Sequence, residues 1–369
     1  VSPGSVTAAV TDLIGAGYLH EAPAPRDGDS TRGRPPVALA VRPDAGFVAG
    51  IKFAPARHTA VIHDFAGNEL GAVSVAGSGP GMTAETLFAQ AEALLGAVLT
   101  RAGLSAGDLV CVGIGVPGFV DREAGQLLWS ALVDERNLPL AALLTQRLGV
   151  EVIVDNDAHL VALAELWFGS GRAVPNFAVV TIEHGVGMGL VLNNQLYRGA
   201  RGLGTELGHM KVQLDGALCQ CGQRGCLEAY ISDYALLREA RTALRWPASG
   251  PGGAELLDHL YLEAKAGNDA ARSIFRRAGR FLALGLANIV NLFDPELILL
   301  SGARMRYDYL YAEEVLTETG RLAIVVDRPA PKVQIHTWGD LIWARGAAAL
   351  ALSQVTARRM GADGLVAAS

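Results

Sequence analysis

Three of the four cysteines of this 369-residue chain lie within eight consecutive positions, and a histidine precedes them by ten residues. The spacing is His209-x9-Cys219-x-Cys221-x4-Cys226. Three thiolates and a neutral imidazole bind Zn²⁺ tetrahedrally, and four protein ligands leave no open coordination position. Gly222 and Gly225 supply the tight turns that a small metal loop needs. The sequence therefore predicts a structural zinc site; the alternative is a set of free thiols in a core.

The use of cysteine also indicates a compartment. Cysteines this close together rarely form a disulfide framework, so a reducing environment with a metal site is favoured. Cys111, the fourth cysteine, lies in an apolar stretch and is expected to be a buried thiol. The chain shows neither a signal peptide nor an uninterrupted run of 18 apolar residues, so we expect a cytoplasmic protein without membrane contact.

Two stretches of the chain share the order strand, loop, strand, turn, strand, which indicates an internal duplication. The first covers residues 47–64, a turn at Gly67-Asn68 and residues 70–75. The second covers a strand at 177–182, a glycine turn at 185–189, a strand at 190–192 and a turn at Asn193-Asn194. Further strands are expected at 109–116, 151–154 and 297–300, and helices at 83–101, 157–168, 231–245, 254–266, 268–291, 306–321 and 338–358. We predict two α/β lobes that face a cleft.

The first 45 residues predict a different kind of element. Ser2 is a candidate N-cap and Pro3 suits a first helical turn. Apolar residues then follow at helical spacing and are expected to form one buried stripe, namely Val6, Val10, Leu13 and Ile14. An extended segment at 18–22, a polar loop at 26–36 and a strand at 37–41 complete the back half of a winged helix-turn-helix. We expect the helices of its front half to precede Val1.

The cysteine motif carries a specific resemblance. Cys219-Gln-Cys-Gly-Gln-Arg-Gly-Cys-Leu-Glu228 resembles the signature Cys-x-Cys-Gly-x-x-Gly-Cys-x-Glu of the ROK family (repressors, open reading frames and kinases). Gly204-Thr-Glu-Leu-Gly-His209 is similar to the family's segment just upstream, and the resemblance covers nearly the whole chain. It implies an α/β, two-lobed actin/hexokinase-like fold, a duplicated ribonuclease-H-like unit, preceded here by a partial winged helix-turn-helix.

The same resemblance implies domain boundaries and a sugar pocket. The expected domains are 1–45 for the DNA-binding segment, 46–168 for the N-terminal lobe, to which the C-terminal helix returns, and 169–369 for the C-terminal lobe with the zinc loop. The residues implied to contact the sugar are Gly118, Asn156, Asp157, Glu206, His209 and Glu228. Carboxylate, amide and imidazole groups suit sugars because each hydroxyl both donates and accepts. His209 is expected to bind zinc through one ring nitrogen and a sugar hydroxyl through the other.

Several of these residues have a second interpretation. In the family's kinases the residue matching Asp157 is the general base, yet Asp155-Asn156-Asp157 also fits a strand-to-helix N-cap. Glu206 fits a hydrogen bond within the zinc loop, and Glu228 fits a solvated carboxylate at a helix start. Gly118 is expected to let the backbone approach the ligand.

The nucleotide half of the kinase pattern is not preserved. Sugar kinases of this superfamily carry Asp-x-Gly-x-Thr after the first strand, whose N–H groups cradle phosphate and whose Asp helps to hold Mg²⁺. Here Lys52 stands where the Asp is expected, Ala54 replaces the Gly, and Pro55 lacks an N–H. In the second glycine loop, Glu183 and His184 replace small or hydroxyl residues, and the added carboxylate would repel ATP. The alternative for that loop is a plain turn between strands.

The candidate DNA surface is the helix face opposite the apolar stripe, together with the polar loop. The residues expected to contact DNA are Ser5, Thr7, Ala8 and Thr11 in the helix and Arg32 and Arg34 in the loop. Small and hydroxyl residues fit a major groove, and arginines beside Gly and Pro can enter a narrow minor groove. Residues 1–45 hold four arginines against five acidic residues, which is a weak footprint for phosphate. A polar linker with a capped helix is therefore the alternative.

These features favour a sugar-responsive, DNA-binding transcriptional repressor of carbohydrate metabolism that is not an enzyme. An ATP-dependent sugar kinase of the same family is the alternative, and a sugar-binding module without DNA function is the third possibility. The expected partners are a hexose, a pentose or a derivative as effector, and operator DNA. A homodimer or homotetramer is expected because winged-helix repressors usually bind two half-sites.

Overall fold

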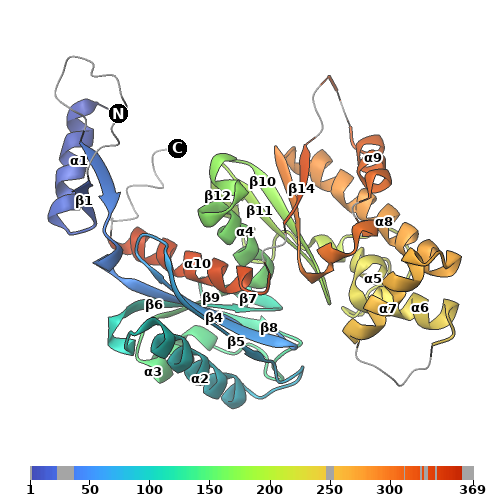
Figure 1. Cartoon of the computed structure of the whole chain (residues 1–369), viewed down its shortest axis with the longest axis horizontal. Coiled ribbons are helices and arrows are strands. Elements are labelled where there is room, and N and C mark those ends of the chain that lie inside the picture. The colour runs from blue at the N-terminus through green and yellow to red at the C-terminus, as the bar shows by residue number, and fades with distance from the viewer. Residues whose placement is uncertain are drawn as a thin grey trace. The chain divides into compact units, whose positions relative to one another are not determined.

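The structure is a computed structural model that describes residues 2–22, 37–246, 253–310, 312–324, 326–327, 331–336 and 339–359 (Figure 1). Its helices are α1 (Pro3–Gly15), α2 (Ala84–Ala102), α3 (Leu140–Leu148), α4 (Asp157–Phe168), α5 (Glu228–Ile231), α6 (Asp233–Ala243), α7 (Gly253–Lys265), α8 (Asp269–Phe293), α9 (Glu313–Leu322) and α10 (Ile342–Arg359). Its strands are β1 (Leu19–Ala22), β2 (Ala38–Val41), β3 (Phe47–Lys52), β4 (Arg57–Asp64), β5 (Glu69–Ala76), β6 (Leu109–Val116), β7 (Phe119–Asp121), β8 (Gln126–Trp129), β9 (Val152–Asn156), β10 (Phe177–Ile182), β11 (Val186–Leu192), β12 (Gln195–Tyr197), β13 (Leu297–Ser301) and β14 (Lys332–Ile335). Across these described ranges, none of the helices has the length and apolar character needed to cross a membrane.

The chain divides into two compact units. The first comprises Val1–Gly118, Arg122–Asp155 and Ala347–Ser369, and the second comprises Phe119–Asp121 and Asn156–Gly346. The chain therefore passes between the units on either side of β7, at the end of β9 and again inside α10. The domain boundaries given by the sequence remain a prediction.

The first unit is built on a five-stranded sheet of order β5-β4-β3-β6-β9. β3, β4 and β5 form an antiparallel meander, and β6 pairs parallel with β3. α2 packs against β4 and β5 through its apolar face, which includes Leu87, Leu94 and Val98. The side chain of Thr83 caps this helix by accepting from the amide of Thr86, and Gly103 ends it in the left-handed conformation.

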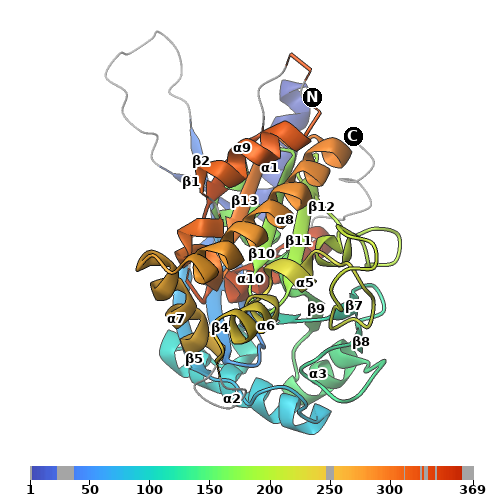
Figure 2. The same cartoon turned by 90° about the vertical axis from the view of Figure 1, so that its right-hand side faces the viewer.

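The second unit repeats this topology. Its sheet has the order β12-β11-β10-β13-β14, again a three-stranded antiparallel meander followed by strands in parallel. The long helix α8 buries one side against this sheet's core, and α9 lies alongside it, as both views show (Figures 1 and 2). Two sheets with the same strand order confirm the predicted duplicated α/β fold.

The predicted glycine turn at 185–189 is wrong in its extent. β11 already begins at Val186, so the turn covers only residues 183–185 and the last two glycines lie inside a strand. A Cβ at Gly187 would lie 2.7 Å from the Cβ of Ala158, and a Cβ at Gly189 would lie 2.7 Å from the Ala158 carbonyl oxygen. These glycines are therefore required by the close approach of α4 to the sheet.

The predicted helix at 306–321 is also shorter than expected. α9 begins only at Glu313, and residues 303–306 and 308–310 form 3-10 turns. Tyr307, between the two turns, is fully buried, and its hydroxyl donates to Asp258 at 2.8 Å. This buried contact holds the segment in place of a continuous helix. The short elements β7, β8, β14 and α3 were not predicted.

The N-terminal segment has the predicted helix and hairpin. The hydroxyl of Ser2 accepts from the amide of Ser5, as expected of an N-cap, and β1 pairs antiparallel with β2. The predicted apolar stripe, however, is not buried: Val6 is half exposed, and Val10, Leu13 and Ile14 are only partly covered. β1 is the main element in contact with α1, and a two-stranded hairpin is too small to cover the stripe.

Candidate metal and ligand site

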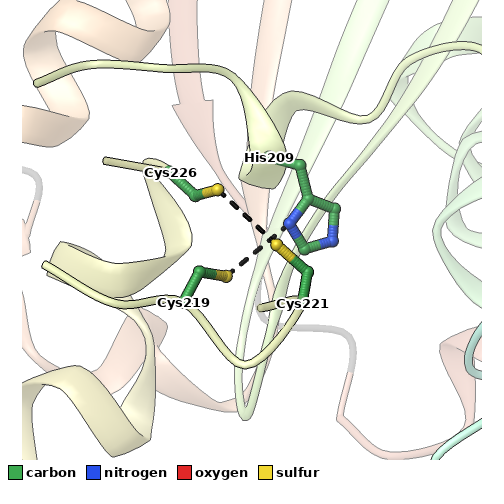
Figure 3. A group of neighbouring side chains, drawn as sticks. All are labelled: His209, Cys219, Cys221 and Cys226. Atoms are coloured by element: carbon green, nitrogen blue, oxygen red, sulfur yellow. Dashed lines mark hydrogen bonds between the residues drawn. The ribbon is translucent and has the colours of Figure 1, made fainter. Parts of the chain in front are cut away.

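His209, Cys219, Cys221 and Cys226 lie together in the second unit, and their ligand atoms are all within 4.8 Å of one another (Figure 3). Sγ of Cys221 lies 3.7 Å from Sγ of Cys226, and Sγ of Cys219 lies 3.8 Å from Nδ1 of His209. Around a tetrahedral ion with metal–sulfur bonds of about 2.3 Å, neighbouring sulfurs are about 3.8 Å apart. The group thus has the donors and the spacing to hold a metal ion, and all four cysteines of the chain are free.

Local backbone contacts fix the loop that carries this group. The amide of Cys219 donates to the carbonyl of Gln223 at 2.8 Å, and the amide of Leu227 donates to the carbonyl of Met210 at 2.9 Å. Gly225 has φ +78°, and a Cβ there would collide with the Gln213 carbonyl, so only glycine fits.

Lys211 places a positive charge beside the sulfur atoms. Its Nζ donates to Sγ of Cys226 at 3.0 Å. Three thiolates with a divalent cation carry one net negative charge, which the lysine offsets from outside the ligand set.

Glu206 lies beside His209 of the metal group, near the ring nitrogen Nε2. Its Oε2 lies 4.0 Å from Nε2 of His209, so the ring presents Nδ1 to the cysteines and Nε2 to this carboxylate. Partial burial raises the pKa of Glu206 to about 7; the nearby His159 lowers it, and the charges of Asp157 and Glu228 raise it further. Asp157 and Glu228 therefore each lie close enough to Glu206 for their charges to act on it.

An unusual backbone conformation positions Glu206. The preceding residue, Thr205, has φ +65°, which a β-branched residue rarely adopts. Its hydroxyl lies 3.5 Å from Nε2 of His159, a buried side chain of α4. Strained residues of this kind concentrate at functional sites. Neither feature was predictable from the sequence, because a positive φ at threonine and the partner of a lone histidine follow only from tertiary contacts.

Asn156 and Asp157 stand at the start of α4. Oδ1 of Asn156 accepts from the amide of Ala158 at 2.8 Å, so the N-cap interpretation is confirmed for this residue. Asp157 is the first residue of the helix and is half-buried. The positive end of the helix dipole favours a carboxylate at that position.

Glu228 is not the solvated carboxylate that the alternative interpretation describes. It is the first residue of α5 and is only 9% exposed. Oε2 accepts from the amide of Val186 at 3.2 Å, and Oε1 lies 3.5 Å from Sγ of Cys219. This one carboxylate therefore joins the metal group to the second glycine loop.

Tyr234 is a residue of this site that the sequence did not reveal. Its hydroxyl lies 3.3 Å from Oε1 of Glu228 and 3.5 Å from Sγ of Cys219, so it can donate to either. Tyr234 lies on α6, six residues beyond the cysteine signature, and helical spacing alone predicts only a packing role for it.

A buried ion pair is joined to the second glycine loop by a backbone hydrogen bond. Arg304 and Asp233 form a bidentate pair with both N–O distances at 2.5 Å. The amide of Asp233 also donates to the carbonyl of Glu183 at 3.1 Å. The pair joins residues 71 positions apart, a separation that no motif spacing indicates.

Several backbone donors of the two glycine loops are engaged within the protein. In the first loop, the amide of Phe53 donates to Gly115 at 2.9 Å and the amide of Ala54 donates to Nδ1 of His58 at 3.3 Å, while Pro55 has no donor. Lys52, at the end of β3, is 4% exposed. In the second loop, the amide of Glu183 donates to Gly185 at 2.9 Å, in addition to the bond from Val186 to Glu228.

Gly118 belongs to the first unit, apart from the other five predicted sugar residues, which all belong to the second. It has φ +122°, and a Cβ there would collide with the Trp129 carbonyl. This position requires glycine for packing; its predicted approach to a ligand remains a prediction.

The predicted DNA-contacting residues of α1 are on the surface. Ser5, Thr7, Ala8 and Thr11 are all exposed, and the Thr11 hydroxyl donates to the Thr7 carbonyl at 2.9 Å. Arg32 and Arg34 lie outside the described residues. Their roles remain predictions.

The sequence is similar to a known protein family and to curated proteins of two kinds, repressors and kinases. The sequence profile of the ROK family matches residues 71–354. A xylose repressor of Caldicellulosiruptor bescii is 26% identical over 361 residues, which is 96% of this chain and 90% of the repressor. A glucokinase of Streptomyces coelicolor is 34% identical over 208 residues, which is 53% of this chain and 65% of the kinase.

Solved structures show the same two kinds of relative. A ROK family transcriptional regulator, a homolog of the E. coli MLC protein, superimposes with a TM-score of 0.78 over 99% of this chain and 92% of its own, at 23% identity. A ROK family glucokinase from Streptomyces griseus, in complex with glucose and AMPPNP, gives a TM-score of 0.70 over 84% of this chain and 100% of its own, at 30% identity.

Proposed function

The chain belongs to the ROK family, and from this premise we propose that it is a sugar-responsive transcriptional repressor whose pocket binds a sugar without phosphorylating it. One observation carries the proposal. Glu206, His209 and Glu228 lie together around the metal group in the second unit, and the charge of Asp157 acts on Glu206. In the two glycine loops, four backbone donors are engaged by the protein itself, namely the amides of Phe53, Ala54, Glu183 and Val186.

The sugar site consists of Asp157, Glu206 and Glu228, with Asn156 and His209 beside them. Carboxylates that repel one another are stabilised when hydroxyl groups enter and donate to them, because each hydroxyl replaces water with a fixed partner. A pentose or a hexose presents such a set of hydroxyls, in keeping with the xylose repressors and glucokinases among the relatives. Gly118 is proposed to contact the same ligand through its backbone.

The metal group is proposed to hold zinc. His209, Cys219, Cys221 and Cys226 would be its ligands, and a closed four-ligand shell makes the ion structural. When bound, zinc supplies rigidity: it fixes the ring of His209, so that Nε2 points at the sugar site with a fixed tautomer. The hydrogen bond from Tyr234 then holds Glu228 at the other edge of the group.

The DNA-binding role rests on α1 and the hairpin that follows it. Ser5, Thr7, Ala8 and Thr11 would face the major groove, and Arg32 and Arg34 would enter the minor groove. A second copy of the chain, in a homodimer or homotetramer, would supply the other half-site. A gel shift of the full-length protein against the DNA upstream of its own gene, with and without sugar, tests this part.

A sugar kinase is the second candidate, and the identity of 34% with the Streptomyces coelicolor glucokinase favours it. In a kinase, Asp157 would be the base that takes a proton from a sugar hydroxyl. Against it stand the engaged amides of Phe53, Ala54 and Val186, which are no longer available to a triphosphate. The carboxylate of Glu183 would also repel a triphosphate.

Calorimetry separates the two candidates. We expect D-xylose or D-glucose to bind with the same affinity in the presence and absence of Mg·ATP. The reason is that amides of the glycine loops are already hydrogen-bonded within the protein and that Glu183 would repel the nucleotide. A coupled assay in the same samples should detect no sugar phosphate. Steady phosphorylation of either sugar would contradict the repressor proposal in favour of the kinase, and no binding by any pentose or hexose of a panel would contradict both.

The variant Tyr234→Phe tests the link between the metal group and the sugar site. Losing a hydrogen bond to a charged group costs about 1.5 kcal/mol, so the dissociation constant of the sugar should rise roughly tenfold. Zinc content, measured by elemental analysis, should stay at the wild-type value because no ligand is removed. Tyr197→Phe, an exposed position of β12, is the control. An unchanged sugar affinity would show that Glu228 is held without Tyr234.

A further inference from the structure

The last helix, α10, belongs to both units. Residues 342–346 lie in the second unit and residues 347–359 in the first. Its first turn is part of a buried apolar cluster, in which Ile342 and Trp343 pack with Val161 and Ala162 of α4. α10 therefore begins against the helix whose N-terminus carries Asn156 and Asp157.

Two glycines let α10 contact its neighbours backbone to backbone. A Cβ at Gly346 would collide with the carbonyl of Leu160 in α4, and a Cβ at Gly113 in β6 would collide with the carbonyl of Ala347. Gly346 of α10 thus touches α4 in the second unit. The next residue, Ala347, touches β6 in the sheet of the first unit. Because no side chain separates the two backbones at Gly346, a movement of α4 toward α10 would push on α10.

The other end of α10 contacts the N-terminal segment. The guanidinium carbon of Arg359 lies 5.7 Å from the ring centroid of Tyr18 and 5.8 Å from that of Phe65. The two rings are themselves 5.7 Å apart, and Nη1 of Arg359 donates to the carbonyl of Ala45 at 2.7 Å. Arg359 therefore contacts three places in the first unit: Tyr18 just before β1, Phe65 just after β4, and Ala45 just before β3.

Tyr18 connects α1 to the hairpin through backbone hydrogen bonds. Its amide donates to the carbonyl of Leu13 in α1 at 2.9 Å, and its carbonyl accepts from the amide of Arg42, just after β2, at 2.9 Å. A contact that holds Tyr18 thus holds both parts of the segment. We call the group of Tyr18, Phe65, Ala45 and Arg359 the Arg359 latch.

We propose that α10 carries the effect of sugar binding from α4 to the N-terminal segment, and that the Arg359 latch is where it is delivered. This inference rests on the proposed function. Sugar contacts at Asn156 and Asp157 bias the position of α4, α10 follows because it abuts α4 at Gly346, and Arg359 at its far end changes how Tyr18 is held. Two sites and one element that both can bias are what allosteric coupling requires.

Hydrogen exchange with mass spectrometry on the full chain tests the relay, with D-xylose and D-glucose as probes. In the wild type, the sugar should change the exchange of the amides of α1, β1 and β2, which are far along the chain from the sugar residues. In Arg359→Gln this change should be lost, because a neutral amide neither stacks as a cation on the two rings nor reproduces the fork of donors. The sugar affinity of the variant, measured by calorimetry, should remain close to the wild-type value.

Matched variants test whether the effect of Arg359→Gln comes from the Arg359 latch or from a general loss of stability. Arg358→Gln removes the neighbouring positive charge on the same helix, which pairs with Glu151, and should keep the sugar-dependent change. Tyr18→Phe keeps the ring and should also keep it, whereas Tyr18→Leu should lose it.

The outcomes distinguish the two proposals. No binding by any sugar of the panel would overturn the proposed function and the relay with it. Sugar binding without a change in α1, β1 and β2 of the wild type would overturn the relay alone, as would a change that persists in Arg359→Gln.

Discussion

Replacing Cys221 by serine should release the metal ion and lower the melting temperature of the second unit. A structural zinc ion contributes its binding free energy to folding, and a serine hydroxyl is a poor ligand for it. Losing one of four ligands is expected to cost about 3 to 5 kcal/mol, which corresponds to a decrease of roughly 6 to 20 °C for a unit of this size. Cys221 is the exposed member of the group, so the change removes a ligand and little packing.

The control for this prediction is the cysteine that lies outside the group. Cys111 is fully buried in β6, where burial raises the pKa of its thiol to about 12, and it is not a member of the metal group. Cys111→Ala should keep full zinc content and lose only about 1 kcal/mol of stability. Elemental analysis and differential scanning calorimetry of both variants are the measurements. A Cys221→Ser protein that melts at the wild-type temperature, with wild-type zinc, would contradict a structural role for the group.

The sequence predicted those parts of the fold that local pattern determines. β6 and β10 are found at the predicted residues because both are almost entirely apolar and lie in the interior of a sheet, with a strand on each side. α1 begins as predicted because Ser2 and Pro3 act within one turn. The errors occur where a distant contact decides: Gly187 and Gly189 read as a turn but belong to a strand that α4 covers.

The candidate site likewise contains residues that a local pattern predicts and residues that only tertiary contacts reveal. The metal group was predictable because its four residues lie within one loop at a spacing set by the ion. Asp157, Glu206 and Glu228 were identified by resemblance, and the structure adds what holds each one: the helix start, the strained Thr205, and the amide of Val186. The contacts of Tyr234, and the pair of Arg304 with Asp233, follow only from the folded chain.

Asp157→Ala should weaken sugar binding about 100-fold. A carboxylate that accepts from one or two sugar hydroxyls contributes about 3 kcal/mol, and alanine leaves those hydroxyls without a partner. The fold should be retained because Asn156, and not Asp157, supplies the cap of α4. Glu255→Ala, an exposed carboxylate in the first turn of α7, should leave the affinity unchanged. Calorimetry with D-xylose and D-glucose is the measurement, and wild-type affinity in Asp157→Ala would remove this residue from the pocket.

The variant Asp157→Asn then separates binding from catalysis. An asparagine keeps the shape of the side chain and accepts a hydrogen bond through its oxygen, but it cannot take up a proton. In a sugar receptor, Asp157→Asn should bind within about tenfold of the wild type, and sugar should still alter the gel shift of the full-length protein. In a kinase, the same variant would bind sugar but lose turnover by about 10²-fold or more, because its base is gone. Residual phosphorylation in the wild type that disappears in this variant would therefore identify Asp157 as a base and exclude a purely sensory pocket.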